Sequence, residues 1–456
     1  KTQMVKRARD IDDEATSTFT STTSPMPSPK KQTLSPKKKA SPKKLKSADS
    51  PKSRSKSKSK SSPTKKKPPP NEKKEKTLKQ AKEKKPKKPK VVIQSATEVD
   101  PLTYLPPTSP TAKYFTAVSW NCAGLRGTLA KNPDILSDLI KATATCAHGV
   151  NQPPDLIMLQ ETKLQEMHVD GSDKKIDLRN ILSKEGYDDY WACSTAKKGY
   201  SGTAMFVRRS VPGKEKKQTD MSSFFGSSKE TTKKEEAYSS KVKVKSQPVY
   251  PLPTTPPTYG FGGPGHASLA EGRTITLNYD KFTITNAYVP NAGQSLERLD
   301  YRTKTWDKDF YDFNKAQEKE KQKPVVWGGD LNVAYDKYDT WNEGAKHHPK
   351  QAGLTQVERD GFKKQLDDGG FKDAFRTLHG EKHGHYSYWS MRSGARAPNK
   401  GLRLDYFVCG EGMFEEEGGG GEGGVRVHNS FMVPEFQGSD HAPCVLELEI
   451  NQNSIF

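Results

Sequence analysis

Polar residues that could bind a cation or move a proton stand at the ends of short apolar runs. The run 117–120 leads into Asn121, and the run 325–327 leads through two glycines into Asp330. The full set is Asn121, Glu161, Asp330, Asn332, Asp405, Asp440 and His441. Carboxylates, amides and one imidazole, without a thiolate, suit a hard divalent cation such as Mg²⁺. Such a set also suits phosphodiester hydrolysis, in which a carboxylate or imidazole activates water beside the metal.

Strands that end at one edge of a sheet would bring these side chains into one pocket. We predict strands at 117–120, 156–159, 203–207, 274–277, 282–287, 325–327, 385–391, 404–408, 425–433 and 444–450. Helices are predicted from Pro133 onward, over about 299–318, and from the capping box that begins at Thr355. Many strands with dispersed helices predict a layered α/β fold, with two packed sheets flanked by helices.

The charge of the chain is concentrated at one end. The 456 residues carry a net charge of +21, and 31% of them are hydrophobic, well below the usual 45–50% or so. Residues 1–100 hold 30 Lys and Arg against 10 Asp and Glu, which leaves the remainder near +1. We therefore predict a disordered Lys/Ser/Pro-rich tail over 1–112 and a catalytic domain over 113–456. The favoured role of the tail is binding nucleic acid through its charge, and the alternative is a solvated segment that only keeps the protein soluble. By composition, 211–269 and 415–424 are inserted loops.

Cysteine usage and hydropathy restrict the cellular setting. The five cysteines are scattered, without a C-x-x-C pair, which fits a reducing compartment. No apolar run approaches the roughly 18 residues of a membrane span. Together with the cationic clusters of the tail, this predicts a nuclear protein, and leaves a mitochondrial or plastid pool open because the chain begins at Lys1.

Seven segments, in order along the chain, resemble the exonuclease III family of apurinic/apyrimidinic (AP) endonucleases. They are Ser119–Arg126, Leu159–Lys163, Lys198–Gly202, Ala287–Gly293, Gly329–Ala334, Arg403–Phe407 and Gly438–His441. The Glu, Asp-x-Asn and Ser-Asp-His elements are typical of the wider endonuclease/exonuclease/phosphatase superfamily. The Tyr-Val-Pro-Asn-Ala-Gly and Leu-Asp-Tyr-Phe segments are more specific to the AP endonuclease branch.

The resemblance implies a four-layer α/β sandwich and a Mg²⁺-dependent cut on the 5′ side of an abasic site, with Mn²⁺ able to substitute. Glu161 then looks like the metal ligand, with Asn121 and Asp440 lining the metal pocket. Asn332 would orient the attacking water, and His441, oriented by Asp405, would bind a phosphate oxygen. Asp330 matches the residue that activates the attacking water, and Tyr288 would support the phosphate or the leaving oxygen. The choice between Asp330 and Tyr288 for activating the water stays open.

The resemblance also implies contacts to double-stranded DNA. Candidate DNA-binding residues are Arg126, Tyr200, Asn291 and Arg392, and candidates for an apolar pocket around the flipped abasic sugar are Tyr388, Trp389, Leu402 and Leu404. Tyr200 and Trp389 could equally be ordinary buried aromatics. The sequence departs from the family at Ala123, where an acid or amide is usual beside the metal, at Leu402 in place of a Trp, and at Gln294 in place of an Arg.

A peptide box inside the first inserted loop indicates a partner. Gln218, Met221, Phe224 and Phe225 have the spacing of the box that docks on the sliding clamp PCNA. Two adjacent Phe residues in a polar segment need a burial site that the loop does not offer. The alternative is a chance match in a low-complexity loop.

Three functions remain in competition at this point. The favoured one is a monomeric AP endonuclease of base excision repair. The second is mainly a 3′-phosphodiesterase or 3′–5′ exonuclease of the same family. The third is a clamp-recruited DNA-binding protein whose nuclease site has weakened, for which Ala123 is the supporting feature.

Overall fold

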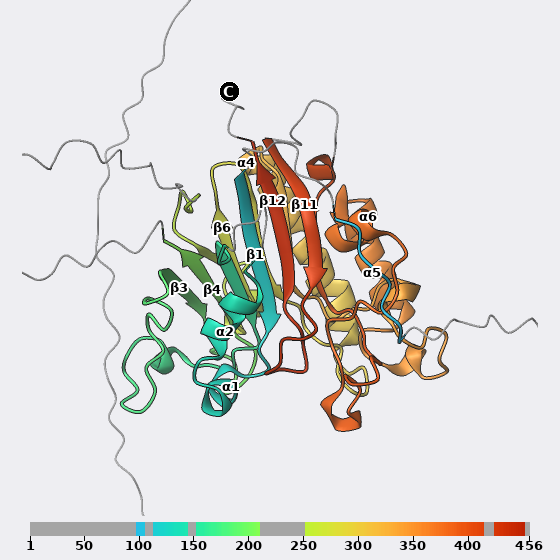
Figure 1. The fold of residues 1–456 in the computed structure, drawn as a ribbon, viewed down its shortest axis with the longest axis horizontal. Helices are drawn as coiled ribbons and strands as arrows, with labels where there is room; N and C mark the ends of the chain where they lie inside the picture. Colours follow the sequence, from blue (N-terminus) through green and yellow to red (C-terminus); the bar gives the residue numbers. More distant parts are fainter. Residues whose placement is uncertain (1–96, 105–112, 145–151, 210–250, 415–423, 452–456) are drawn as a thin grey trace, which may run out of the picture. The chain divides into compact units, whose positions relative to one another are not determined.

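Two six-stranded sheets pack face to face in the part of the chain that the computed structural model describes, residues 97–104, 113–144, 152–209, 251–414 and 424–451 (Figure 1). The first sheet has the order β11-β12-β1-β2-β4-β3. Its strands are β1 (Lys113–Asn121), β2 (Leu156–Gln160), β3 (Tyr187–Ala192), β4 (Thr203–Arg208), β11 (Val425–Met432) and β12 (Cys444–Ile450). The pair β1 and β2 is parallel, and the other pairs of this sheet are antiparallel.

The second sheet repeats this mixed pattern, with the order β5-β6-β7-β8-β10-β9. Its strands are β5 (Thr258–Tyr259), β6 (Thr274–Asn278), β7 (Thr283–Tyr288), β8 (Val325–Asp330), β9 (Phe371–Asp373) and β10 (Asp405–Gly410). Here β7 and β8 are the parallel pair. Both sheets are therefore mixed.

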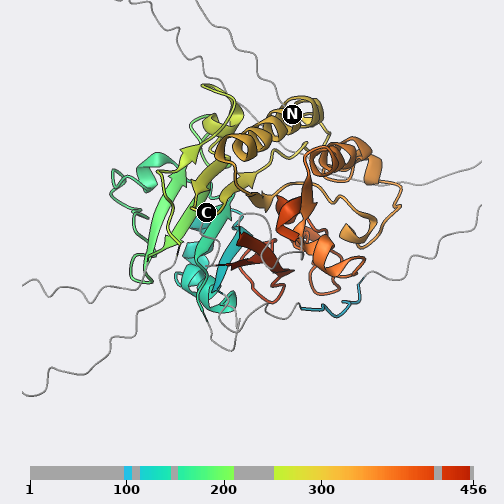
Figure 2. The ribbon, with the colours of Figure 1, turned by 90° about the horizontal axis from the view of Figure 1, so that it is seen from above.

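Helices cover the outer faces of both sheets, which makes four layers (Figure 2). The helices are α1 (Leu125–Lys131), α2 (Ile135–Ala142), α3 (Ala267–Ala270), α4 (Asp307–Lys321), α5 (Gln356–Asp367) and α6 (Ala374–His379). Leu136 and Leu139 of α2 pack on the first sheet, and Phe310 and Phe362 of α4 and α5 pack on the second. The central cluster joins inward-facing residues of the two sheets, such as Met158 and Ile284. The predicted four-layer α/β sandwich is confirmed.

The helix signals in the sequence have the expected physical basis. Thr355 caps α5 in a capping box with Glu358, as its spacing predicted. The helix predicted over 299–318 begins as a π-helical segment over Tyr301–Trp306 and continues as α4.

Three sequence-based boundaries differ from the structure. The strand predicted over 385–391 is wrong: Tyr388 forms isolated bridges to Leu402 and His441 and does not join a sheet. Of the loop predicted over 211–269, the described part from 251 contains β5 and α3, and Phe261 is buried. Residues 97–104, which the predicted tail over 1–112 includes, hydrogen-bond to the body through Asp100. The loop 415–423 and the box 218–225 lie outside the described residues.

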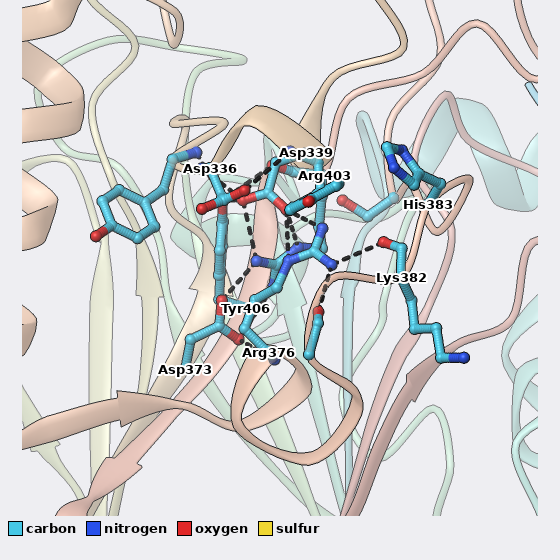
Figure 3. A network of polar contacts seen from close by, with 12 residues as sticks. Asp336, Asp339, Asp373, Arg376, Lys382, His383, Arg403 and Tyr406 are labelled. Carbon is cyan, nitrogen blue, oxygen red and sulfur yellow. Dashed lines mark hydrogen bonds and ion pairs between the residues drawn. The ribbon is translucent and has the colours of Figure 1, made fainter. Parts of the chain in front are cut away.

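A buried network of charges surrounds Arg403, two residues before β10 (Figure 3). Arg403 donates to both carboxylate oxygens of Asp339 (2.8 and 3.0 Å) and also bonds Asp373. Arg376 donates to Asp339 as well, through Nε at 3.1 Å. Burial alone would raise the pKa of Asp339, but the two arginines outweigh burial and hold this pKa well below its usual range. Every charge in this network has an opposite partner.

Candidate active site

A cavity of about 360 Å³ lies where β1, β2, β7 and β8 end. It gathers most of the site residues that the sequence predicted. Those that line it are Asn121, Glu161, Tyr288, Asn291, Asp330, Asn332, Tyr388, Leu402, Leu404, Asp440 and His441. The convergence of strand ends on one pocket is thus observed.

Strand register determines how these side chains meet. Asp330 ends β8 and Asp405 begins β10, and the two residues are direct partners across the antiparallel pair. Tyr288, the last residue of β7, is the partner of Asp330 on the parallel side. A chain reversal before β12 then brings His441 to Asp405.

Asp405 holds His441 in its charged form. His441 Nδ1 lies 2.7 Å from Asp405 Oδ2, and both residues are buried. Burial lowers the pKa of His441, but the Asp405 carboxylate outweighs it, and the net result raises the pKa to about 10. Because Nδ1 is occupied, Nε2 is the nitrogen that can donate to a ligand.

Asp330 is a carboxyl group poised near neutrality. Its Oδ2 accepts from Asn121 Nδ2 (2.8 Å), and its Oδ1 accepts from the backbone N–H of Asn332 (3.0 Å). Burial raises the pKa of Asp330 to about 7, against the lowering effect of His441. A group with this pKa can take a proton from water at neutral pH.

Tyr288 is held in its protonated form. Burial, and then the charge of Glu161, raise its pKa well above the ordinary value, although Arg273 opposes them. The Arg273 guanidinium lies 4.7 Å from the centre of the Tyr288 ring. Between the two candidates that the sequence left open, the electrostatics favour Asp330 as the group that activates water.

Two sets of side chains compete as the metal site. Within the described residues, Asp330, Asp405 and His441 bring ligand atoms within 4.8 Å of one another, so a buried acid–imidazole cluster could hold an ion. In this set His441 Nδ1 and Asp405 Oδ2 are already bonded to each other. The predicted set of Glu161, Asn121 and Asp440 supplies hard oxygen donors on the same cavity and fits Mg²⁺ better.

Lys163 compensates for the departure at Ala123. Its Nζ lies 2.9 Å from Glu161 Oε1 and donates to the carbonyl oxygen of Ala123 (3.3 Å). The main chain therefore replaces the side-chain partner that an acid at 123 would give Lys163. This arrangement weakens the case for a lapsed nuclease, because it keeps Glu161 and Lys163 in place.

Backbone strain gathers around the cavity. Ala123, Glu161, Lys163 and Asn332 all have φ between 51° and 56°, the left-handed region that non-glycine residues seldom adopt. Such outliers persist where surrounding structure fixes them, often at functional sites. The sequence carries no signal of this strain.

A polar bridge between the sheets lies directly below the site, and sequence analysis missed it. Gln160 Nε2 donates to Asn286 Oδ1 (2.8 Å), and Asn286 Nδ2 donates to the Leu159 and Ala204 carbonyls. Both side chains are fully buried. Because Glu161 follows Gln160 and Tyr288 lies two residues after Asn286, this bridge fixes the two sheets relative to each other at the cavity.

The predicted DNA-contact residues separate into two kinds. Tyr200 is half-buried, and its hydroxyl accepts hydrogen bonds from Arg273 (2.8 Å) and Arg298. Asn291 lines the cavity and donates to Asn332 Oδ1 (2.8 Å). Arg126 and Arg392 are exposed outside the cavity, where a long ligand but not a small one could reach them.

The apolar wall of the cavity contains Tyr388, Leu402 and Leu404, but not Trp389. Trp389 packs in a separate cluster with Tyr386 and donates its indole N–H to Asn399. The structure therefore does not place Trp389 in the sugar pocket where the sequence analysis put it. Gln351, Ala352 and Gly353 also line the cavity and were missed, because they lie in a loop without a motif.

Comparison with known proteins identifies the class that this fold and site define. The sequence matches the model of the Endonuclease/Exonuclease/phosphatase family over residues 118–441, and the chain belongs to this family. In the part of the chain described, no helix is long and apolar enough to cross a membrane.

Relatives narrow the family further. An exodeoxyribonuclease of Bacillus subtilis is 33% identical over 73% of this chain and 98% of its own length. A DNA-(apurinic or apyrimidinic site) endonuclease of Dictyostelium discoideum is 31% identical over 73% of this chain and 70% of its own. A DNA repair nuclease, APEX1, of Danio rerio is 33% identical over 73% and 81%.

A solved structure shows the same architecture. The AP endonuclease of Leishmania major matches with a TM-score of 0.55 and 26% identity, covering 78% of this chain and 95% of that one. The resemblance to the exonuclease III family of AP endonucleases is confirmed, and the protein is an enzyme of a hydrolase family.

Proposed function

We propose that the protein is a Mg²⁺-dependent DNA-(apurinic or apyrimidinic site) endonuclease of base excision repair. It hydrolyses the phosphodiester 5′ to an abasic site and leaves a 3′-hydroxyl and a 5′-deoxyribose phosphate. The observation that carries the proposal is one cavity that combines a carboxyl group of pKa about 7, a protonated imidazole and an apolar wall. The relatives named as AP endonucleases support the same reaction.

Each side chain has a defined task in this reaction. Asp330 takes the proton of the attacking water, and Asn121 and Asn332 hold its carboxylate in place. His441 donates from Nε2 to a phosphate oxygen, where negative charge develops in the transition state. Mg²⁺ held by Glu161, Asn121 and Asp440 would supply further positive charge there, and Mn²⁺ suits the same oxygen donors.

The apolar wall supplies selectivity for a sugar without a base. Leu402 and Leu404 are more than nine-tenths buried, and Tyr388 packs its ring 5.0 Å from the ring of His441. A flipped deoxyribose can contact this wall beside the phosphate, whereas a nucleotide with its base needs more room. Leu402 gives a smaller contact surface than the Trp expected from the family pattern.

The direct test is incision of a duplex that carries one tetrahydrofuran site. With Mg²⁺ the purified protein should cut on the 5′ side and leave a 3′ end that a polymerase extends, and EDTA should stop the reaction. Absence of incision in the presence of Mg²⁺ or Mn²⁺ would contradict the proposal.

A second candidate is a 3′-phosphodiesterase or 3′–5′ exonuclease, because several relatives are named exodeoxyribonuclease. Rates on an internal abasic site and on a 3′-phosphate end, measured with one enzyme preparation, separate the two. A rate at least about tenfold higher at the 3′ end would favour the second candidate.

We further propose that residues 218–225 dock on the sliding clamp and that the cationic tail directs the protein to the nucleus. Both proposals are supported by sequence patterns alone. Replacing Phe224 and Phe225 with Ala should abolish clamp binding in calorimetry while leaving incision unchanged. A fluorescent fusion without residues 1–96 should lose its nuclear enrichment.

A further inference from the structure

Residues 97–104, called the strap below, lie against the loop 383–402, called the wall loop, although the strap precedes β1 in the chain. Asp100 makes a reciprocal pair with His383: the N–H of Asp100 donates to the His383 carbonyl (3.2 Å), and the N–H of His383 donates to Asp100 Oδ2 (2.8 Å). His385 Nε2 donates to the Asp100 carbonyl (2.7 Å). Three hydrogen bonds therefore join one strap residue to the start of the wall loop.

Gly384 lets the strap approach this closely. A Cβ at residue 384 would lie 2.2 Å from the carbonyl oxygen of Glu98, and its φ of +79° is a conformation that side chains rarely adopt. Gly384 is nevertheless buried. The contact between strap and wall loop thus depends on the absence of a side chain at this position.

Asn399 connects the strap to the interior of the wall loop. Its Nδ2 donates to the carbonyls of Thr97 (3.3 Å) and Gly384 (2.9 Å), and its Oδ1 accepts from the indole N–H of Trp389 (3.1 Å). The φ of Asn399 is +49°, in the left-handed region that Asn tolerates better than most residues. One side chain therefore bonds both ends of the wall loop and the strap.

The opposite side of the wall loop faces the cavity. Trp389 donates its backbone N–H to the carbonyl of Asp440 (2.9 Å), and Tyr388 exchanges two backbone hydrogen bonds with Leu402 (2.8 and 2.9 Å). Tyr388, Leu402 and Asp440 all line the cavity. Hydrogen bonds through Asn399 and Trp389 thus connect the strap to this part of the cavity lining.

We propose that the strap is a positioning segment of the enzyme, which holds the wall loop so that Tyr388 and Leu402 contact the abasic sugar. The proposal rests on the proposed function, because it assigns the wall to that sugar. Holding a wall in place affects the reaction through orientation of the substrate, and a displacement of about 1 Å can cost up to about 100-fold in rate. The strap then belongs to the catalytic body and not to the cationic tail that it follows.

The test compares full-length variants on the tetrahydrofuran duplex at saturating Mg²⁺. Asp100→Ala removes the carboxylate that accepts from the His383 N–H. Gly384→Ala adds a methyl group on the wall loop that pushes the strap away. Both should lower kcat/KM by about 10- to 100-fold while the melting temperature shifts little. Asp100→Asn retains an oxygen acceptor and should keep the parent rate, and Glu98→Ala, which alters an exposed side chain, is the matched control.

Hydrogen exchange of residues 385–402 provides a readout that a general loss of stability would not produce. We expect faster exchange of these amides in Asp100→Ala than in Glu98→Ala, with the core strands unchanged. The proposal for the strap would be overturned if Asp100→Ala and Gly384→Ala both had the kinetics of the parent. It would also be overturned if both variants unfolded globally, because the strap would then stabilise the whole fold and not the wall loop alone. If the parent itself does not incise the duplex, the proposed function fails instead.

Discussion

Two buried charged clusters share the stretch of chain 402–406 and differ in how completely their charges are paired. Arg403 points into the network in which Asp339 and Asp373 both neutralise it (Figure 3). Asp405, two residues on, has His441 as its partner, and its Oδ1 has no hydrogen bond within the described residues. The same few residues therefore build a fully paired cluster on one side and an incompletely paired one on the other.

The difference shows how burial can serve stability or reactivity. In the Arg403 network burial is outweighed, and the pKa of Asp339 lies well below its usual range. In the cavity burial prevails, and the pKa of Asp330 rises to about 7. Perturbed groups of the second kind are typical of catalytic sites, because their proton affinity matches the task at neutral pH. Leu402 and Leu404, on either side of Arg403 in the sequence, line the cavity.

Asp330→Asn should produce the largest effect and break the comparison on the cavity side. It removes the group that we propose takes the proton of water, so the incision rate should fall by about 10²–10⁴-fold. The free energy of unfolding should stay equal or increase, because an amide can be buried at lower cost than a carboxylate. Single-turnover incision and urea unfolding of the same preparation check both halves.

Asp339→Asn should break the comparison on the other side. It leaves Arg403 and Arg376 without their shared carboxylate, and loss of one partner from a buried ion pair typically costs about 3–5 kcal/mol. Urea unfolding measures this loss. Asp300→Asn, which alters an exposed pair with Lys304, is the control and should unfold like the parent.

Asp155→Asn should sharpen the comparison, because Asp155 is buried and poorly paired but lies outside the cavity. It accepts from the N–H of Thr116 (2.9 Å), while Arg208 is 3.9 Å away, and burial raises its pKa to about 7. Because the pKa of Asp155 is higher in the folded protein than in the unfolded chain, where it is about 4, protonation of Asp155 stabilises the fold. This stabilisation is complete below about pH 4 and is lost as the pH rises through about 7. In the variant, the free energy of unfolding should no longer change with pH in this range, and the incision rate should equal that of the parent. A reduced incision rate would contradict the distinction between Asp155 and the carboxyl groups of the cavity.

Ala123→Asn should give the smallest effect, and a favourable one. At a φ of 52°, Ala pays a conformational cost that Asn tolerates better, so we expect a gain of up to about 1 kcal/mol in stability. The new amide also adds an oxygen donor near Glu161, which should lower the Mg²⁺ concentration for half-maximal incision. An unchanged Mg²⁺ requirement would show that a side-chain oxygen at residue 123 adds nothing to the hydrogen bond that Lys163 already makes with the Ala123 carbonyl.

The sequence predicted those parts of the site that depend on local residue patterns. Apolar runs that end in Asn121, Glu161 and Asp330 indicate strand ends, and their convergence on one edge follows from the fold class. Strand order and register are set by long-range packing, so the direct pairing of Asp330 with Asp405 had no local signal. The same holds for Lys163 with the Ala123 carbonyl and for the docking of residues 97–104.

Aromatic side chains were the least predictable part. Tyr388 and Trp389 are neighbours, and because successive side chains of a strand-like segment point to opposite sides, one lines the cavity and the other packs behind it. Their backbone N–H groups bond to residues distant in the sequence, Tyr388 to Leu402 and Trp389 to Asp440. These long-range hydrogen bonds, which have no local signal in the sequence, decide which of the two side chains faces the cavity.

The central claim is that the incompletely paired cluster performs the chemistry and the paired one supports it. One experiment measures it directly: single-turnover incision of the tetrahydrofuran duplex per folded molecule, for Asp330→Asn and Asp339→Asn side by side at the same Mg²⁺ concentration. We predict a loss of at least about 100-fold for Asp330→Asn and a rate within about tenfold of the parent for Asp339→Asn. Equal losses in the two variants, or parental incision by Asp330→Asn, would contradict the account.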